Sequence, residues 1–224
     1  MNKQKVVMFD LDGTVLDTLP DLALSANYAL KSLGFPEQTT EQVRMAIGHG
    51  IRNLLKDLMH CEDTEILEKC RSIFQEYYNK NKALTTKPYA GIPELLQYLK
   101  DRNCKIILIS NKYDGATQEL VRQFFGDIFD GVYGSRDGIA PKPDRAIFDF
   151  VCERDGIDKD KIIYIGDSEV DFEFASNCDM EFIGVSWGFR KRDQLLDCGA
   201  QTIADSVAEL KSYLDLSLAK QKSK

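Results

Sequence analysis

The stretch KVVMFDLDGTVLD, residues 5–17, decides the fold. Its first part, Lys5–Phe9, is an apolar run of strand length that is rich in valine, and Asp10 and Asp12 follow it directly. In an open α/β sheet, ligands bind beyond the carboxyl ends of the strands, so acids in this place are typical of such a sheet. The pair Asp12-Gly13 between apolar runs is also typical of a hairpin turn, so this stretch alone does not separate the two interpretations.

Further apolar runs of strand length follow along the chain. They are rich in valine or isoleucine and lie at Cys104–Ile109, Lys161–Ile165 and Glu181–Val185, with a weaker run at Gly131–Tyr133. Stretches with apolar residues at helical spacing separate most of them, at Pro93–Lys100, Ala116–Phe125, Arg145–Cys152 and Glu169–Asn177. This alternation predicts an α/β fold, a doubly wound, Rossmann-like parallel sheet with helices on both faces.

The stretch after the first strand has a different pattern. From about Thr18 to Leu84 no strand is convincing, and four amphipathic stretches indicate helices at Pro20–Leu33, Thr40–Ile47, Ile51–Met59 and Thr64–Tyr78. We therefore predict an inserted α-helical cap domain at residues 17–84. The α/β core is expected at residues 1–16 and 85–216, with Lys87–Gly91 as the returning hinge, because Pro88 and Gly91 mark a connector. A basic tail is expected at residues 217–224.

The composition narrows the class of protein. The chain has 224 residues, of which 43% are apolar and 29% charged, which is typical of a folded globular protein. Its net charge of −7 disfavours binding to nucleic acid or to an anionic membrane. No run approaches a membrane span or a signal peptide. The six cysteines form no CxxC pair, which is typical of free thiols in a reducing compartment, so we expect a cytoplasmic protein. The sequence is compatible with either a monomer or a dimer.

Polar motifs follow the predicted strands at several places. Ser110-Asn111 follows the second strand, the segment 166–171 (GDSEVD) follows a later one, and Lys142 lies in a loop between two prolines. With Asp10 and Asp12, the sheet would bring several carboxylates into one crevice, where they cannot all stay ionised without a compensating charge. Mg²⁺ binds such carboxylates together with phosphate oxygens. The acids could hold a metal ion, and the lysine and the serine hydroxyl could bind the oxygens of a phosphate group. This combination indicates phosphoryl transfer, a reaction in which a carboxylate can be the nucleophile.

These motifs, in this order, resemble those of the haloacid dehalogenase superfamily of phosphohydrolases. The resemblance rests on residues 10–17, 110–112, 142–143 and 166–171, and it spans nearly the whole chain. The helical insert is similar to the cap of the branch that includes phosphoglycolate phosphatases. Further similarities to that branch lie at residues 48–52, 88–91 and 184–188.

The resemblance implies a role for each position. Asp10 would be the nucleophile and a Mg²⁺ ligand, and Asp12 the general acid and base, with its backbone carbonyl also on the metal. Lys142 would steady the nucleophile, and Asp167 and Asp171 would be metal ligands, the latter directly or through a neighbour. The substrate's phosphoryl group or its remainder would be bound by Ser110, Asn111, Thr14, Arg52 and His49.

Several functions share this set of residues. The first expectation is a Mg²⁺-dependent phosphatase of a small phosphorylated metabolite, with phosphoglycolate as the first candidate. A phosphotransferase or mutase of sugar phosphates would use the same core, although the resemblance implies that Thr14 after Asp-Gly favours hydrolysis. A nucleotidase or a pyrophosphatase would use this core as well. A phosphonatase would need an imine-forming lysine, for which Lys56 is a weak candidate. A non-catalytic receiver domain would need about half this length and no insert.

Overall fold

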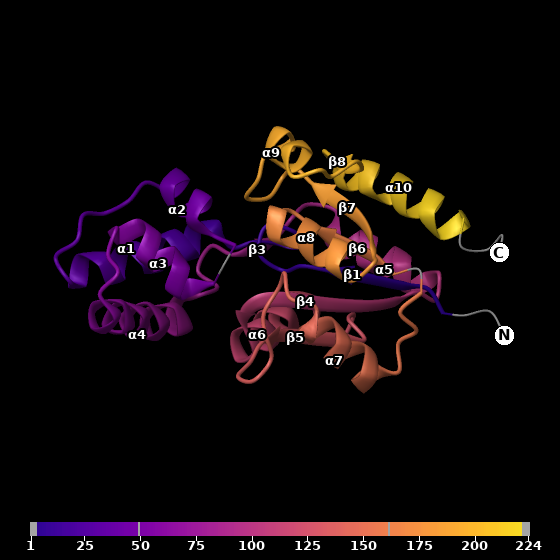
Figure 1. The fold of residues 1–224 in the computed structure, drawn as a ribbon. Helices are drawn as coiled ribbons and strands as arrows, with labels where there is room; N and C mark the ends of the chain where they lie inside the picture. Colours follow the sequence, from indigo (N-terminus) through magenta and orange to yellow (C-terminus); the bar gives the residue numbers. More distant parts are fainter. Residues whose placement is uncertain (1–3, 49, 161, 221–224) are drawn as a thin grey trace. The chain divides into compact units, whose positions relative to one another are not determined.

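The computed structural model describes residues 4–48, 50–160 and 162–220 (Figure 1). Within these residues the chain divides into two units. The helical unit is Leu16–Lys87, and the core unit consists of the described residues before and after it. His49, which the sequence placed at the substrate, lies outside the described residues.

A parallel sheet of six strands forms the centre of the core unit, among the described residues. The strand order is β5-β4-β1-β6-β7-β8, and every neighbouring pair is parallel. The strands are β1 (Val6–Phe9), β4 (Lys105–Tyr113), β5 (Gly131–Ser135), β6 (Ile163–Gly166), β7 (Glu181–Val185) and β8 (Ile203–Ala204). The chain runs outward from β1 through β4 to β5 and then returns to the other side of β1. This reversal confirms the predicted doubly wound α/β sheet and creates a ligand-binding edge beside β1.

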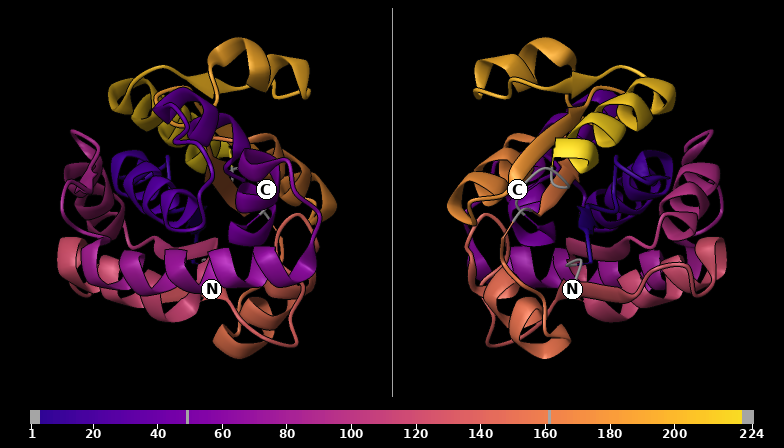
Figure 2. Two further views of the ribbon diagram at one scale, coloured as in Figure 1. Left: turned by 90° about the vertical axis from the view of Figure 1, so that its left-hand side faces the viewer. Right: turned by 90° about the vertical axis from the view of Figure 1, so that its right-hand side faces the viewer.

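Helices cover both faces of this sheet (Figure 2). Val6 and Met8 of β1 point into a core with α7 (Ala146–Asp155) and α8 (Glu169–Asn177). The other face is covered by helices that include α5 (Ile92–Asp101) and α10 (Val207–Lys220), which pack against each other. The remaining helices of the unit are α6 (Asp114–Phe125) and α9 (Arg192–Asp197). With both faces covered, all four residues of β1 are buried, as the unbroken apolar run predicted.

The end of the chain differs from the prediction. The structure adds α9, β8 and α10 after the last predicted strand. The sequence analysis assigned residues 217–220 to the basic tail, but helix α10 continues through them. Ser217 and Leu218 are buried within the core unit, which explains why the helix extends this far. Strand β4 is also longer than predicted and runs to Tyr113, with an irregularity in its pairing with β5 between Ile109 and Tyr113.

The helical unit contains four α-helices among the described residues. They are α1 (Leu19–Ser32), α2 (Thr40–Ala46), α3 (Ile51–Met59) and α4 (Thr64–Asn81). Apolar residues at helical spacing, including Leu30, Leu55 and Phe74, are buried between them. Thr39 caps α2 in a capping box with Gln42, which satisfies backbone groups that a helix leaves unpaired at its start. The short strands β2 (Leu16–Asp17) and β3 (Lys87–Pro88), where the chain passes between the units, pair with each other.

A buried aspartate ties the two ends of the helical unit together. The carboxylate of Asp21, at the start of α1, accepts hydrogen bonds from the backbone N–H groups and the hydroxyls of Thr85 and Thr86, at 2.6–3.1 Å. Burial alone would raise the pKa of Asp21, but these hydrogen bonds outweigh it and lower the pKa. The ionised side chain therefore stabilises the folded unit.

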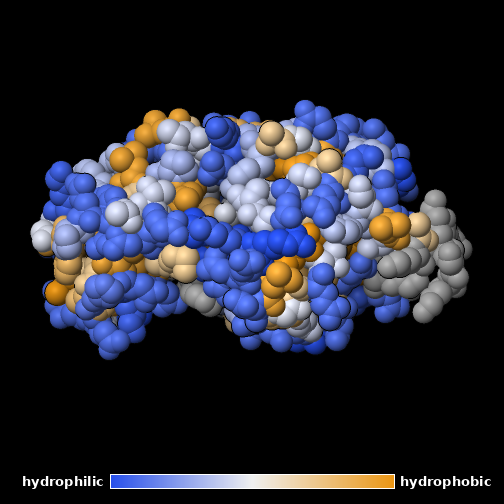
Figure 3. All heavy atoms as spheres, turned by 90° about the horizontal axis from the view of Figure 1, so that it is seen from above, coloured by the Kyte–Doolittle hydropathy of each residue, from blue (hydrophilic) through white to orange (hydrophobic). Residues whose placement is uncertain are grey.

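The exposed surface agrees with the acidic, charged composition. Hydrophilic residues predominate on the face that Figure 3 shows, and hydrophobic residues form small groups between them. Large apolar side chains that are exposed occur in both units, such as Tyr28 and Leu216. None of the described helices has the combination of length and apolar character that crossing a membrane requires.

We expect Asp21→Asn to destabilise the protein by about 2–3 kcal/mol at neutral pH, because the amide cannot accept all the donors of Thr85 and Thr86. The native pKa lies below the ordinary value of an aspartate, so the wild-type advantage is complete above that ordinary value and is lost as the pH falls through the native pKa. Urea denaturation at neutral and acid pH measures both effects. A difference between the two proteins that does not shrink at acid pH would contradict this role of Asp21.

Candidate active site

The register of the sheet brings the polar motifs to one edge. Phe9 pairs with Leu108 of β4 on one side and with Ile165 of β6 on the other. The backbone N–H of Asp10 donates to Ile165 O at 2.9 Å, which fixes the first residue beyond β1. As a result Asp10, Ser110 and Asp167 emerge at the carboxyl end of the sheet beside the strand reversal.

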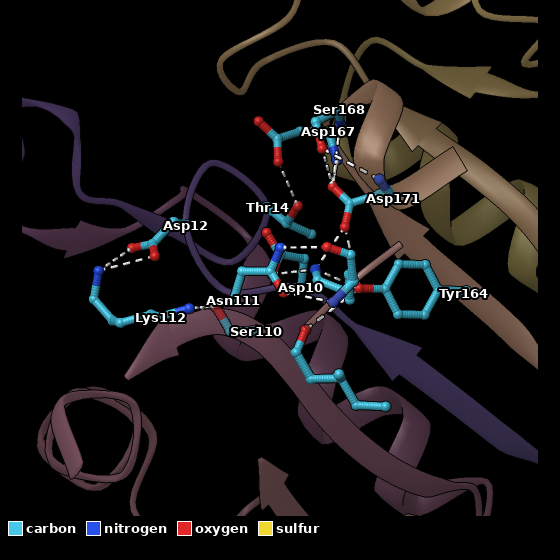
Figure 4. Close-up of polar contacts among 12 residues, drawn as sticks. Asp10, Asp12, Thr14, Ser110, Asn111, Lys112, Tyr164, Asp167, Ser168 and Asp171 are labelled. Atoms are coloured by element: carbon cyan, nitrogen blue, oxygen red, sulfur yellow. Dashed lines mark hydrogen bonds and ion pairs between the residues drawn. The ribbon is translucent and has the colours of Figure 1, made fainter. Parts of the chain in front are cut away.

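Three carboxylates meet at this edge (Figure 4). Asp10, Asp167 and Asp171 each offer one oxygen, and these oxygens all lie within 4.8 Å of one another. All three side chains are buried. The structure thus brings together acids that are up to 161 positions apart (171 − 10 = 161) in the sequence.

One lysine lies among these acids. Lys142 Nζ donates to Asp10 Oδ1 at 2.8 Å, to Asp171 Oδ1 at 2.7 Å and to the Tyr164 hydroxyl at 2.8 Å. An ammonium group has three N–H donors, and these three contacts use all of them. Burial opposes the charge of Lys142, but the carboxylates of Asp10 and Asp171 outweigh it and raise the pKa of the lysine.

A single lysine does not balance three carboxylates. Burial raises the pKa of Asp10 to about 7; the charge of Lys142 opposes this, and the charges of Asp171 and Asp12 add to it. Burial, followed by the charges of Asp171 and Asp10, raises the pKa of Asp167 well above its usual value. The cluster carries up to three negative charges and one positive charge, so it is a site for further positive charge.

The hydrogen bonds of Asp167 and Asp171 differ. Asp167 accepts one hydrogen bond on each oxygen, from the Thr14 hydroxyl at 3.1 Å and from the Phe189 N–H at 2.6 Å. Asp171 Oδ2 accepts three, from the Asp167 N–H and from the N–H and hydroxyl of Ser168, while Oδ1 accepts from Lys142 and Tyr164. Asp167 therefore keeps more acceptor capacity for a ligand than Asp171 does.

Two glycines allow the backbone to approach Asp167 closely. Gly13 has a φ of +83°, and a Cβ at this position would collide with Asp167 Oδ2. A Cβ at Gly188 would collide with the same oxygen. The Asp12-Gly13 pair is therefore part of the loop beside the acids, and β1 pairs with its neighbours in parallel rather than as a hairpin.

Asn111 and Ser110 lie next to Lys142 and Lys112. The Asn111 amide donates to Lys142 O and accepts from Lys142 N, both at 2.8 Å, and so fixes the backbone of this lysine. The Ser110 hydroxyl accepts from the Lys112 N–H at 3.2 Å. Asn111 and the fully buried Thr14, both expected at the substrate, thus bond to other residues of the site.

Asp12 lies apart from the other acids and has its own lysine. Figure 4 shows its carboxylate turned toward Lys112, and Lys112 Nζ is 2.9 Å from each carboxylate oxygen. Of the residues expected at the substrate, Arg52 belongs to the helical unit, where it lies on α3 near Glu68. Lys56, the candidate for imine chemistry, pairs with Glu62 in the same unit.

Sequence reasoning assigned no role to several residues of this site. Tyr164 is fully buried in β6 and bonds to Lys142 and Asp171. A polar hydroxyl in a strand of isoleucines was the available signal for it. Lys112 follows Ser110-Asn111 directly, but a lysine beside a strand end is common and gave no indication of its partner. The backbone N–H of Phe189 leaves no signal in a sequence at all.

Comparison with known proteins gives a consistent result. The family model of haloacid dehalogenase-like hydrolases matches residues 7–185, which is most of the chain. The chain is 32% identical over 211 residues to a phosphoglycolate phosphatase from Nitrosospira multiformis, and the match covers 92% of this chain and 93% of that protein. It is 29% identical to a phosphoglycolate phosphatase from Aquifex aeolicus, with coverage of 94% and 98%.

Solved structures show the same fold. A protein from Lactobacillus delbrueckii subsp. bulgaricus is 31% identical, with a TM-score of 0.88 and coverage of 95% of this chain and 98% of that one. A predicted phosphoglycolate phosphatase from Haemophilus somnus is 26% identical, with a TM-score of 0.87 and coverage of 96% and 99%.

We expect Lys142→Met to destabilise the protein by about 3–5 kcal/mol, because it leaves buried carboxylates without their ammonium partner. The control is Lys100→Met, which removes a lysine whose ion pair with Asp130 is about one-third exposed, and which should cost about 1 kcal/mol or less. Urea denaturation of both variants in metal-free buffer measures the difference. Equal small losses would contradict the central position of Lys142 in the cluster.

Proposed function

The chain belongs to the haloacid dehalogenase-like hydrolase family and is a phosphoric monoester hydrolase, and we propose that it is a Mg²⁺-dependent phosphatase that acts through a phosphorylated aspartate. The observation that carries the proposal is the buried cluster of Asp10, Asp167 and Asp171 around the single ammonium group of Lys142. Such a cluster can bind a cation and a phosphoryl group together.

The donor set fits Mg²⁺. Two positive charges would balance the three carboxylates and Lys142, and Mg²⁺ prefers a few carboxylate oxygens with water and phosphate oxygens. We assign the carboxylates of Asp10 and Asp167 as ligands, together with the backbone carbonyl of Asp12. Asp171, whose two oxygens accept five hydrogen bonds against two at Asp167, is assigned to holding Lys142. When bound, the ion would neutralise charge on the transferring phosphoryl group.

The residues of the core unit divide the reaction among them. Asp10 attacks phosphorus, and the bond to the leaving oxygen breaks with its electron pair on that oxygen, which takes a proton from Asp12. Water then attacks phosphorus and gives a proton to Asp12, and the bond from phosphorus to Asp10 breaks with its electron pair on Asp10, which releases inorganic phosphate. Lys142 holds the attacking carboxylate in place, and the Ser110 hydroxyl binds the phosphoryl oxygens. Thr14 and Asn111 act indirectly, through Asp167 and Lys142.

We propose phosphoglycolate as the substrate. Support comes from relatives with that activity in their names, which match nearly the whole length of this chain. The residues that select the substrate's leaving part are proposed to come from the cap, the insert predicted at 17–84, with Arg52 and His49 as candidates. A small anionic metabolite agrees with a site that binds phosphate through a cation in an otherwise acidic protein.

The first test is catalytic. We expect the purified protein to release phosphate from phosphoglycolate in the presence of Mg²⁺, and Asp10→Asn to lower kcat by at least about a thousandfold, since an amide cannot form the phosphorylated intermediate. A matched control is Asp127→Asn, an exposed acid after α6, which should leave kcat unchanged. Full activity of the Asp10 variant, or of the wild type with excess chelator, would overturn the proposed mechanism.

The second test is thermodynamic and needs no substrate. Mg²⁺ at about a hundred times its dissociation constant should stabilise the wild type by about 2.7 kcal/mol, seen as a rise in Tm, because the ion binds only the folded cluster. Asp167→Asn should lose most of this rise. Trp187, the only tryptophan of the chain, donates to Thr14 O beside the cluster, so its fluorescence should report the same titration. An undiminished response in the variant would exclude Asp167 as a ligand.

A further inference from the structure

Asp12 and Lys112 form an ion pair that the proposed reaction does not explain. Lys112 Nζ lies at 2.9 Å from both carboxylate oxygens of Asp12, and the two side chains are only 7% and 14% exposed. Most surface ion pairs contribute little because solvent screens them, whereas a pair with this geometry and burial holds both partners in place. The contact joins positions that are 100 residues apart in the sequence.

The backbone of Lys112 is itself held. Its N–H donates to the Ser110 hydroxyl at 3.2 Å, and its carbonyl oxygen accepts from the Thr117 hydroxyl at 3.2 Å. Thr117 is fully buried in α6, so the lysine is anchored to the core unit from both sides of its backbone. A lysine anchored in this way presents its ammonium group to Asp12 from a fixed base.

The two lysines of the site serve different acids. Lys142 contacts Asp10 and Asp171. Lys112 instead contacts Asp12, as Figure 4 shows. Asp10, the proposed nucleophile, and Asp12, the proposed proton donor and acceptor, are therefore held by separate lysines. This division allows Asp12 to be oriented independently of the groups that bind the phosphoryl group.

We propose that Lys112 is a positioning residue for Asp12 and acts in the second half of the reaction, the hydrolysis of phosphorylated Asp10. The proposal rests on the proposed function and adds a residue to it. As a proton donor to the leaving oxygen, Asp12 is neutral, so its attraction to the ammonium group is weaker than that of the carboxylate. As the base toward water, Asp12 is a carboxylate, whose two oxygens only accept hydrogen bonds, and the contact of Lys112 Nζ with both oxygens suits this form.

The pair leaves room for the water. Each carboxylate oxygen has two acceptor sites, so one contact to Lys112 leaves one site on each oxygen. Water donates a proton to that site while its oxygen bonds to phosphorus, and the bond from phosphorus to the Asp10 oxygen breaks with its electron pair on Asp10. The products are inorganic phosphate, an ionised Asp10 and a protonated Asp12. Lys112 fixes the carboxylate that takes the proton.

The test uses para-nitrophenyl phosphate, whose nitrophenolate leaves without needing a proton from Asp12. In Lys112→Met the phosphorylation step should be nearly unchanged and the hydrolysis step slowed. We expect a burst of nitrophenolate that approaches one per site and exceeds that of the wild type, followed by turnover slower by at least about tenfold. Since kcat/KM reports only steps up to phosphorylation, kcat and KM should fall together. A purely structural role of Lys112 would not produce this split.

Two further variants complete the test. Lys112→Arg keeps a cation that can pair with a carboxylate and should shrink the burst toward that of the wild type. Lys100→Met removes a lysine that lies before the start of β4 and pairs with Asp130, at the opposite end of that strand from Ser110, and should show wild-type kinetics. If the Met variant does not fold, Lys112→Gln, which keeps a donor without the charge, replaces it. A variant in which kcat/KM falls as much as kcat, without a burst, overturns the proposal.

The result separates two failures. If the proposed function is wrong, the wild type itself shows no turnover that depends on Asp10. If only this inference is wrong, the wild type turns over through Asp10 and the Lys112 variants show no excess burst.

Discussion

The ammonium group of Lys142, shared between Asp10 and Asp171, is the contact on which the site depends. Without it three buried carboxylates would face one another at the end of a parallel sheet, and the free energy of ionising them would rise further. With it, burial and the remaining excess of negative charge still raise the pKa of Asp10 to about 7. The lysine thus stabilises the folded site but leaves a net negative charge that a divalent cation would balance.

A cluster of this kind needs a rigid surrounding, because mutual repulsion would otherwise separate the acids. Asn111 fixes the backbone of Lys142, Ser168 fixes Asp171 at the start of α8, and Phe189 fixes Asp167 from the loop after β7. These contacts join residues from four different segments of the chain, at positions 111, 142, 167–171 and 189. The strand reversal beside β1 makes this convergence possible, since it places the ends of β1, β4 and β6 next to one another.

The sequence predicted the parts of this arrangement that follow from periodicity and from charge. Strand β1, helix α8 and the meeting of Asp10 with Asp167 required only apolar runs followed by acids. It missed α9, β8 and α10, because β8 has only two residues and is recognisable only through its pairing with β7. It also could not show that the Thr14 and Asn111 side chains bond to other site residues, since a pattern gives the edge of the sheet but not the direction of a side chain.

The separation of the two lysines has a consequence for the chemistry. A nucleophile must stay aligned with phosphorus through both half reactions, whereas a residue that gives and then takes a proton must change partners between them. Lys142 is fully committed to its contacts with Asp10, Asp171 and Tyr164, so it favours a fixed nucleophile. Lys112 binds the more exposed Asp12 through one ammonium group on a flexible stem, a contact that can open and reform. Because the two acids do not share a lysine, Asp12 can exchange protons without a change in the contacts that hold Asp10.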